Sequence, residues 1–297
     1  MTTPSHLHPH SLAELKGVSL RCHRVVDGLL HGLHRSPHHG SSVEFSEHKE
    51  YSPGDDLRYI DWKAYGRLDK HYVKRFEHES NLSAWCLIDA SGSMGYLGSS
   101  AGLSKLDYAK VLAGSLAYIL IKQQDAFGIV TYREKPKDTL LPAARTGHLN
   151  RVFALLDGVK AEGGSDVPAV VRQIGERARK RGINFILSDF LSDPAHDFAA
   201  FRQLATRNGQ MVAFHLVDPD EAEFPFDSMT LFEGMETKQR LLAEPQLIRK
   251  AYLKRFHAHC AHVKKCSLDS RITYIRVDTS RPPHEILMSF LAHWNRG

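Results

Sequence analysis

From residue 82 onward, short apolar runs alternate with segments of helical periodicity, and this alternation limits the fold more than any other feature of the chain. The runs at residues 84–89, 126–132 and 211–217 are apolar almost throughout. Continuous apolar strands are typical of parallel sheets that are covered by helices on both faces. The alternation therefore predicts an α/β fold with a doubly wound, mostly parallel sheet and right-handed crossovers.

The same periodicity gives the expected elements. Strands are expected at residues 84–89, 126–132, 139–143 (at an edge), 183–187, 211–217 and 271–277. Helices are expected at residues 12–33, 103–123, 148–159, 166–181, 198–208, 245–264 and 284–294. A hairpin is expected where residues 228–232 and 238–242 flank the turn at 233–236.

The first 80 residues have a different pattern. After the helix at 12–33 they contain a loop rich in Pro, Gly, Ser and His and only short strand-like pieces, at 43–45 and 72–76. This stretch has few apolar strands of its own. We therefore expect residues 1–80 to pack as an extension on a core domain formed by residues 81–297.

Composition excludes several classes of protein. The four cysteines form no C-x-x-C pair, which argues against a zinc site. The N-terminus is polar and His-rich and lacks the apolar region of a signal peptide, and no run is long enough to cross a membrane. We therefore predict a cytoplasmic protein. The formal charge of +5 leaves a nucleic-acid or anionic-surface binder as an alternative, although no basic stretch is interleaved with aromatic residues.

Polar side chains follow the apolar strands where ligand sites of doubly wound sheets lie. Asp89, Ser91 and Ser93 follow the first strand, Ser165 precedes a helix, and Asp189 follows the strand at 183–187. Carboxylates and hydroxyls are the oxygen ligands that a hard cation such as Mg²⁺ prefers. These five residues therefore predict a site for Mg²⁺, or for Mn²⁺ or Ca²⁺, with one position open to an acidic group of a partner.

Each of these residues also has a purely structural interpretation. Ser91 or Ser93 can cap the helix that follows, and Asp189 can cap the segment after its strand. The shared location of all five at one edge of the predicted sheet favours the cation site.

The motifs resemble a known family. Leu87-Ile-Asp-Ala-Ser-Gly-Ser-Met94, Gly163-Gly-Ser-Asp166 and Leu187-Ser-Asp189 are similar to the metal-ion-dependent adhesion site of von Willebrand factor A-like domains. The block Pro53-Gly-Asp-Asp-Leu-Arg-Tyr-Ile-Asp-Trp62 resembles the signature of the bacterial domain-of-unknown-function family 58. One departure is Ser165, where A-like domains usually have Thr.

The resemblance implies a function beyond what the residues themselves indicate. Members of this family are often encoded beside MoxR-type AAA+ ATPases. A non-enzymatic adaptor that links such an ATPase to a client protein is therefore the leading expectation. The chain itself has no P-loop motif.

The block at residues 53–62 has two interpretations. Its residues Asp55, Asp56, Arg58, Asp61 and Trp62 form either a partner-docking surface or a folding clasp, in which acidic side chains pair with an arginine and Trp62 anchors the segment. We favour the clasp, because charged clusters beside a turn are commonly structural.

A metal-dependent hydrolase is the enzymatic alternative. Asp166 and His215 are the nearest candidates for a base, but His215 lies within an apolar strand and fits a core histidine better. No Ser-His-Asp, Cys-His or G-x-S-x-G pattern is present.

Overall fold

The computed structural model describes residues 7–33, 47–50, 72–75, 82–175, 182–237 and 239–294. One compact unit consists of Met1–His34 and Leu82–Gly297, and Arg35–Asn81 form a second unit. The residues of the 53–62 block, including Asp55, Asp56, Arg58, Asp61 and Trp62, lie outside the described residues. The predicted boundary at residue 80 stays a prediction.

A six-stranded sheet forms the centre of the first unit, in the order β10-β7-β6-β3-β4-β5. Its strands are β3 (Ser83–Asp89), β4 (Ala126–Tyr132), β5 (Pro136–Ala143), β6 (Gly182–Ser188), β7 (Gln210–Val217) and β10 (Thr273–Asp278). All neighbours are parallel except β5, which runs antiparallel to β4 at the edge. The predicted doubly wound, mostly parallel sheet is confirmed. Its order reverses between β3 and β6, where such folds place ligand sites.

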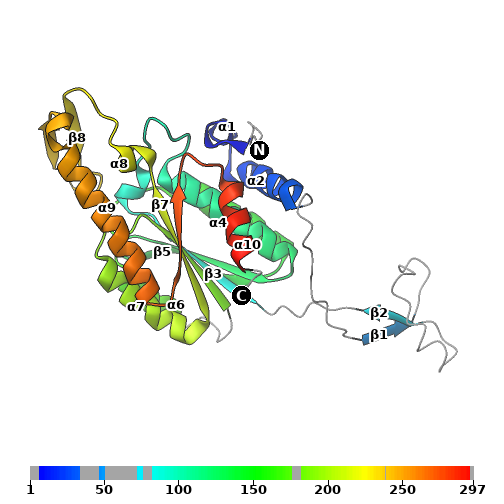
Figure 1. Ribbon diagram of the computed structural model, residues 1–297. Helices are drawn as coiled ribbons and strands as arrows, with labels where there is room; N and C mark the ends of the chain where they lie inside the picture. Colours follow the sequence, from blue (N-terminus) through cyan, green and yellow to red (C-terminus); the bar gives the residue numbers. More distant parts are fainter. Residues whose placement is uncertain are drawn as a thin grey trace. The chain divides into compact units, whose positions relative to one another are not determined.

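Helices cover both faces of this sheet (Figure 1). On one face lie α4 (Lys105–Lys122), α5 (Thr146–Gly158) and α10 (Pro283–Trp294), and α2 (Val18–Leu33) packs against these three helices. The other packs against α6 (Val167–Gly175), α7 (Pro194–Asn208) and α9 (Pro245–Asp269). Alternate residues of β3 serve the two faces: Cys86 and Ile88 join the first core, and Trp85 and Leu87 join the second. This double burial explains why the strand is apolar without a break.

The prediction of one continuous helix over residues 12–33 is wrong. It consists of α1 (Pro9–Ala13) and α2, separated by a turn in which Gly17 has a φ of 84°. A new helix begins at Val18, whose backbone N–H donates to Asp157 Oδ1 at 2.8 Å. The break is therefore set by a side chain of α5, 139 residues further along the chain.

The predicted hairpin is confirmed as β8 (Thr230–Glu233) paired antiparallel with β9 (Arg240–Ala243). A short helix that was not predicted, α8 (Pro219–Glu223), precedes it. In the second unit, β1 (Glu47–Glu50) pairs antiparallel with β2 (Tyr72–Arg75). The strand expected at residues 43–45 lies outside the described residues. Among the helices that the structure describes, none has both the length and the apolar character that a membrane span requires.

The contact between Asp157 and Val18 gives a testable expectation. Replacing Asp157 by Ala leaves the first N–H of α2 without its acceptor, and we expect a loss of about 1 kcal/mol in the free energy of unfolding, as for other helix N-caps. Urea unfolding measures this loss. Asp227→Ala, at an exposed loop position, is the control and should change the free energy by less than about 0.5 kcal/mol. Equal effects of the two substitutions would contradict the capping role.

Candidate functional site

The turn after β3 holds three of the five predicted ligands together. Asp89 ends the strand, and its Oδ1 accepts a hydrogen bond of 2.9 Å from the backbone N–H of Ser91. The hydroxyls of Ser91 and Ser93 lie 3.2 Å apart, and all three side chains are buried. Ser91 precedes the 3-10 helix η3 (Gly92–Gly95) but makes no side-chain cap. The capping interpretation of Ser91 is therefore wrong, and its hydroxyl faces Ser93 instead.

Ser188 is a residue of the site that the sequence analysis missed. It ends β6, the neighbour of β3, and its hydroxyl donates to Asp89 Oδ2 at 2.7 Å. The same hydroxyl accepts the backbone N–H of Phe190 at 2.9 Å. Both oxygens of Asp89 are thus held by protein donors, which fixes the direction of the carboxylate.

The loop that carries Ser165 is hydrogen-bonded to the Asp89 turn. The N–H of Gly92 donates to the carbonyl of Gly163 at 2.8 Å, and the N–H of Glu162 donates to the carbonyl of Ala90 at 3.0 Å. The Ser165 hydroxyl is buried and has no hydrogen-bond partner among the described residues. A buried hydroxyl without a partner is costly, and a cation ligand is one way to satisfy it.

Asp189 lies near the turn, because the side chain of Ser93 contributes to lowering the pKa of its carboxyl. Its Oδ1 also accepts the backbone N–H of Leu191 at 3.3 Å, so the predicted capping role after the strand is present as well. Asp189 Oδ2, however, lies 2.8 Å from the ammonium of Lys105. One oxygen of this predicted ligand is therefore already paired with a cation of the protein.

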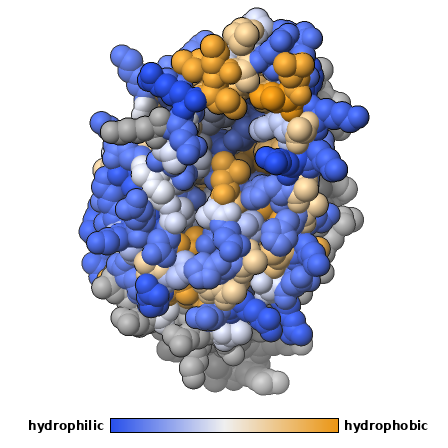
Figure 2. Space-filling model, turned by 90° about the vertical axis from the view of Figure 1, so that its left-hand side faces the viewer, coloured by the Kyte–Doolittle hydropathy of each residue, from blue (hydrophilic) through white to orange (hydrophobic). Residues whose placement is uncertain are grey.

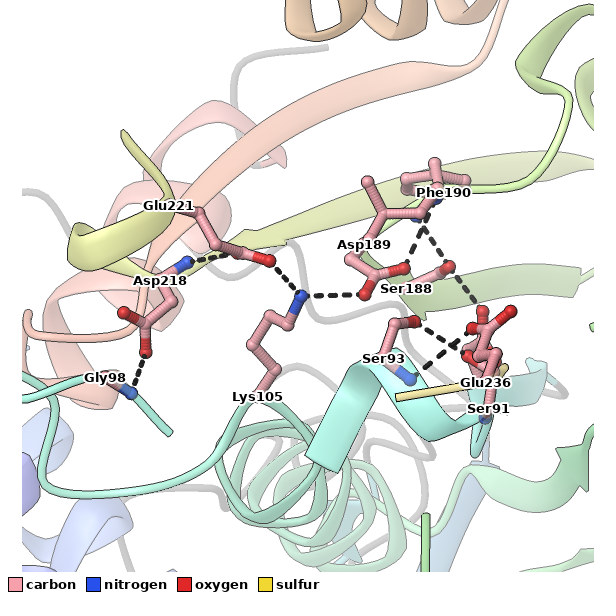
Figure 3. A network of polar contacts seen from close by, with 12 residues as sticks. Ser91, Ser93, Gly98, Lys105, Ser188, Asp189, Phe190, Asp218, Glu221 and Glu236 are labelled. Atoms are coloured by element: carbon pink, nitrogen blue, oxygen red, sulfur yellow. Dashed lines mark hydrogen bonds and ion pairs between the residues drawn. The ribbon is translucent and has the colours of Figure 1, made fainter. Parts of the chain in front are cut away.

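Lys105 is the second residue that sequence analysis missed. It is the first residue of α4, its side chain is 0% exposed, and its Nζ also lies 2.6 Å from Glu221 Oε1 (Figure 3). Burial alone lowers the pKa of a lysine, but here Asp189 and Glu221 outweigh it and hold the pKa of Lys105 above its usual value. The ammonium in turn outweighs burial at Asp189 and lowers the pKa of that carboxyl. These three groups form one buried ionic cluster.

Glu221 reaches Lys105 because of a capping box at α8. The Asp218 carboxylate accepts the N–H of Asp220 at 2.9 Å, and the Glu221 carboxylate accepts the N–H of Asp218 at 3.0 Å. Asp218 also accepts the N–H of Gly98 at 2.9 Å, which ties α8 to the loop before α4. The sequence Asp218-Pro219-Asp220-Glu221 carries this capping signal, but nothing in it indicates the lysine.

Asp89, unlike Asp189, forms no ion pair with any residue that the structure describes, and its oxygens accept from Ser91 and Ser188. Burial, and then the charge of Asp189, raise its pKa to about 7. The carboxylate is therefore the unbalanced charge of the site. A bound divalent cation would supply the missing positive charge.

A third element reaches the Asp89 turn. A methyl group at Gly92 would lie 2.3 Å from the carbonyl oxygen of Met235, in the turn between β8 and β9. The backbone conformation does not require glycine at this position, because the φ of Gly92 is not among the positive values of the described chain. Glycine is needed here because the backbone of Met235 approaches so closely. The next residue, Glu236, accepts the N–H of Ser93 at 3.4 Å through Oε1.

The residues considered for hydrolysis are not arranged for it. Asp166 caps α6, accepting the N–H of Ala169 at 3.1 Å. His215 is buried, and its Nδ1 lies 2.8 Å from the Tyr274 hydroxyl, as expected of a core histidine. No group of three or more His, Cys, Asp or Glu side chains suited to a metal occurs among the described residues. A cation site here depends on serine hydroxyls.

The ionic cluster predicts a large effect of Lys105→Met on stability. Methionine fills a similar volume but leaves two buried carboxylates unpaired, and we expect a loss of about 3–5 kcal/mol in the free energy of unfolding. Lys110→Met is a matched control on the same helix, because its partner Asp107 is 41% exposed, and it should cost less than about 1 kcal/mol. Urea unfolding compares them. Adding Asp189→Asn and Glu221→Gln to Lys105→Met should restore part of the loss.

Buried His215 predicts a pH effect. Burial lowers its pKa to about 3, below its unfolded value, so the unfolded chain binds a proton that the folded chain does not as pH falls below about 6.5. Stability contributed by neutral His215 is therefore lost as pH falls. Between pH 6.5 and 4.5, His215→Gln should reduce the fall in unfolding free energy by about 2 kcal/mol. His257 is exposed, so His257→Gln is the control. If the unfolding free energies of the wild type, His215→Gln and His257→Gln fall in parallel with pH, the pH effect does not come from His215.

The chain is similar to several known proteins. Uncharacterized protein Mb1516 of Mycobacterium bovis and uncharacterized protein Rv1480 of Mycobacterium tuberculosis are each 25% identical to it over 296 residues, which cover 97% of this chain and 91% of the relative. Among solved structures, BatB of Bacteroides thetaiotaomicron is 14% identical with a TM-score of 0.43, covering 73% of this chain and 100% of BatB. The VWA domain of SpRpn10 is 11% identical with a TM-score of 0.39, covering 69% and 93%.

The family model described as "Protein of unknown function DUF58" matches residues 47–262. This range includes the 53–62 block, the Asp89 turn, Ser165 and Asp189. The family expected from the sequence motifs is confirmed. Because the match spans most of the chain, the protein belongs to the DUF58 family.

Proposed function

We propose that this protein is a non-enzymatic interaction module in which the Asp89 turn holds a divalent cation that receives an acidic group of a partner protein. The von Willebrand A-like fold by itself suggests a protein-interaction module, without naming its ligand. The observation that carries the finer proposal is the buried hydroxyl of Ser165, which has no hydrogen-bond partner in the described part of the chain and lies on a loop that is hydrogen-bonded to the turn of Asp89, Ser91 and Ser93.

The proposed ligands have distinct roles. Asp89 supplies the charge, since no cation among the described residues pairs with it, and its raised pKa fits a carboxylate that a cation would stabilise. Ser91, Ser93 and Ser165 supply neutral hydroxyls. Asp189 supports the site through its contact with Ser93, while Lys105 neutralises much of its charge.

This donor set suits Mg²⁺, and Mn²⁺ or Ca²⁺ are the alternatives. When bound, the cation would act as a hard positive centre that attracts a carboxylate. With one charged ligand and three neutral ones, the site retains net positive charge on the metal. That favours an acidic partner group over a neutral one.

The partner itself is proposed from the family resemblance. A MoxR-type AAA+ ATPase or its client protein would present the acidic group, and this chain would connect the two. Co-purification with that ATPase in Mg²⁺ and in chelator is the direct check of this part of the proposal.

Calorimetric titration of Mg²⁺ and Mn²⁺ into chelator-treated protein tests the cation site. We expect saturable binding in the wild type, no measurable binding in Asp89→Ala, and about tenfold weaker binding in Ser165→Ala, because one oxygen ligand is lost. Asp227→Ala is the control and should bind like the wild type. If Asp89→Ala binds both cations as well as the wild type does, the proposed site is wrong.

A further inference from the structure

The β8–β9 hairpin is built to reach the proposed cation site. Near its turn, Phe232 stacks on Phe224 with ring centroids 5.6 Å apart and meets the edge of Phe226 at 5.4 Å. Phe224 in turn packs on Tyr252 of α9 at 4.5 Å. These aromatic contacts hold one face of the hairpin against the compact unit, and this fixes where the turn at Gly234 lies.

The tip of the hairpin lies directly on the Asp89 turn. The approach of the Met235 carbonyl to Gly92 leaves no room for a side chain there. The Glu236 carboxylate reaches the backbone N–H of Ser93, next to the hydroxyls of Ser91 and Ser93 (Figure 3). An acidic group supplied by the chain itself therefore stands beside the proposed ligands.

The outer face of the hairpin is not packed in the same way. Leu231 and Leu242 are directly opposed across the ladder, and they are 51% and 65% exposed. Figure 2 shows apolar side chains gathered at the top of this face of the molecule, over the hairpin. The tip is thus held in place by the aromatic contacts on one face of the hairpin and by its own contacts with the Asp89 turn.

From these contacts we infer that Glu236 is the built-in acidic occupant of the cation site, and that a partner's carboxylate must displace it. This inference rests on the proposed function, because it names the group that competes for the open position of the cation. It assigns Glu236 as a binding residue and makes the tip the element that moves when a partner binds.

Binding of a carboxylate probe tests the inference. In the presence of Mn²⁺, a hexaglutamate peptide should bind Glu236→Ala at least tenfold more tightly than the wild type, because the internal competitor is gone. Glu244→Ala removes an exposed carboxylate just after β9, at a position with no side-chain cap, and should behave like the wild type. Calorimetry measures Mn²⁺ alone first, and then the peptide.

Amide hydrogen exchange tests independently whether the hairpin tip rests on the Asp89 turn. Gly92→Ala would place a methyl group against the Met235 carbonyl, so amide exchange across residues 230–243 should rise several-fold. Glu236→Ala should raise it as well, and Glu244→Ala should not. Unchanged exchange in Gly92→Ala would show that the tip does not rest on the turn, and would overturn the inference.

The calorimetric outcomes separate the two proposals. If wild-type protein and Glu236→Ala both bind Mn²⁺ and bind hexaglutamate equally, the inference about Glu236 is wrong and the cation site stands. If neither protein binds Mn²⁺, the proposed function is wrong, and the inference is overturned with it.

Discussion

The carboxyl edge of the sheet depends on the ion pairs of one lysine, Lys105, whose side chain is fully buried. An ammonium in the interior is tolerated only when carboxylates surround it, and Lys105 finds one at the end of β6 and another on α8. It thereby joins three elements that are far apart in the sequence. Moving any of the three elements away from the others would leave a buried charge unpaired.

The cluster also separates the two aspartates of the site. Asp189 is balanced by the lysine and held in its charged form, whereas Asp89 is oriented by Ser188 and the turn and pairs with no cation in the part of the chain that the structure describes. Two carboxylates that look equivalent in the sequence therefore have different roles. Asp189 contributes to the stability of this edge of the sheet, whereas Asp89 is the ligand that we propose for an external cation. The hairpin tip adds a third carboxylate, Glu236, from the solvent side.

The fold was predictable because buried parallel strands are apolar on both faces, and that pattern is local in the sequence. Asp89, Ser91, Ser93 and Asp189 were predictable because parallel topology brings strand ends to one edge. Lys105 was not, because a charged residue at the start of a helix normally faces solvent. Glu236 was not, because its contact with Ser93 spans 143 residues and depends on how an aromatic cluster seats the hairpin. The break before α2 depends in the same way on a distant aspartate.

That distant aspartate has a consequence for the order of events during synthesis. Asp157, which completes the first turn of α2, leaves the ribosome 139 residues after Val18. At cellular elongation rates of about 5–20 residues per second, this delay is roughly 7 to 30 s. Its packing partner α10 (Pro283–Trp294) emerges later still. Until α5 and α10 follow, α2 can bury its apolar face only against α4, so part of that face is exposed to aggregation or to chaperones in the nascent chain.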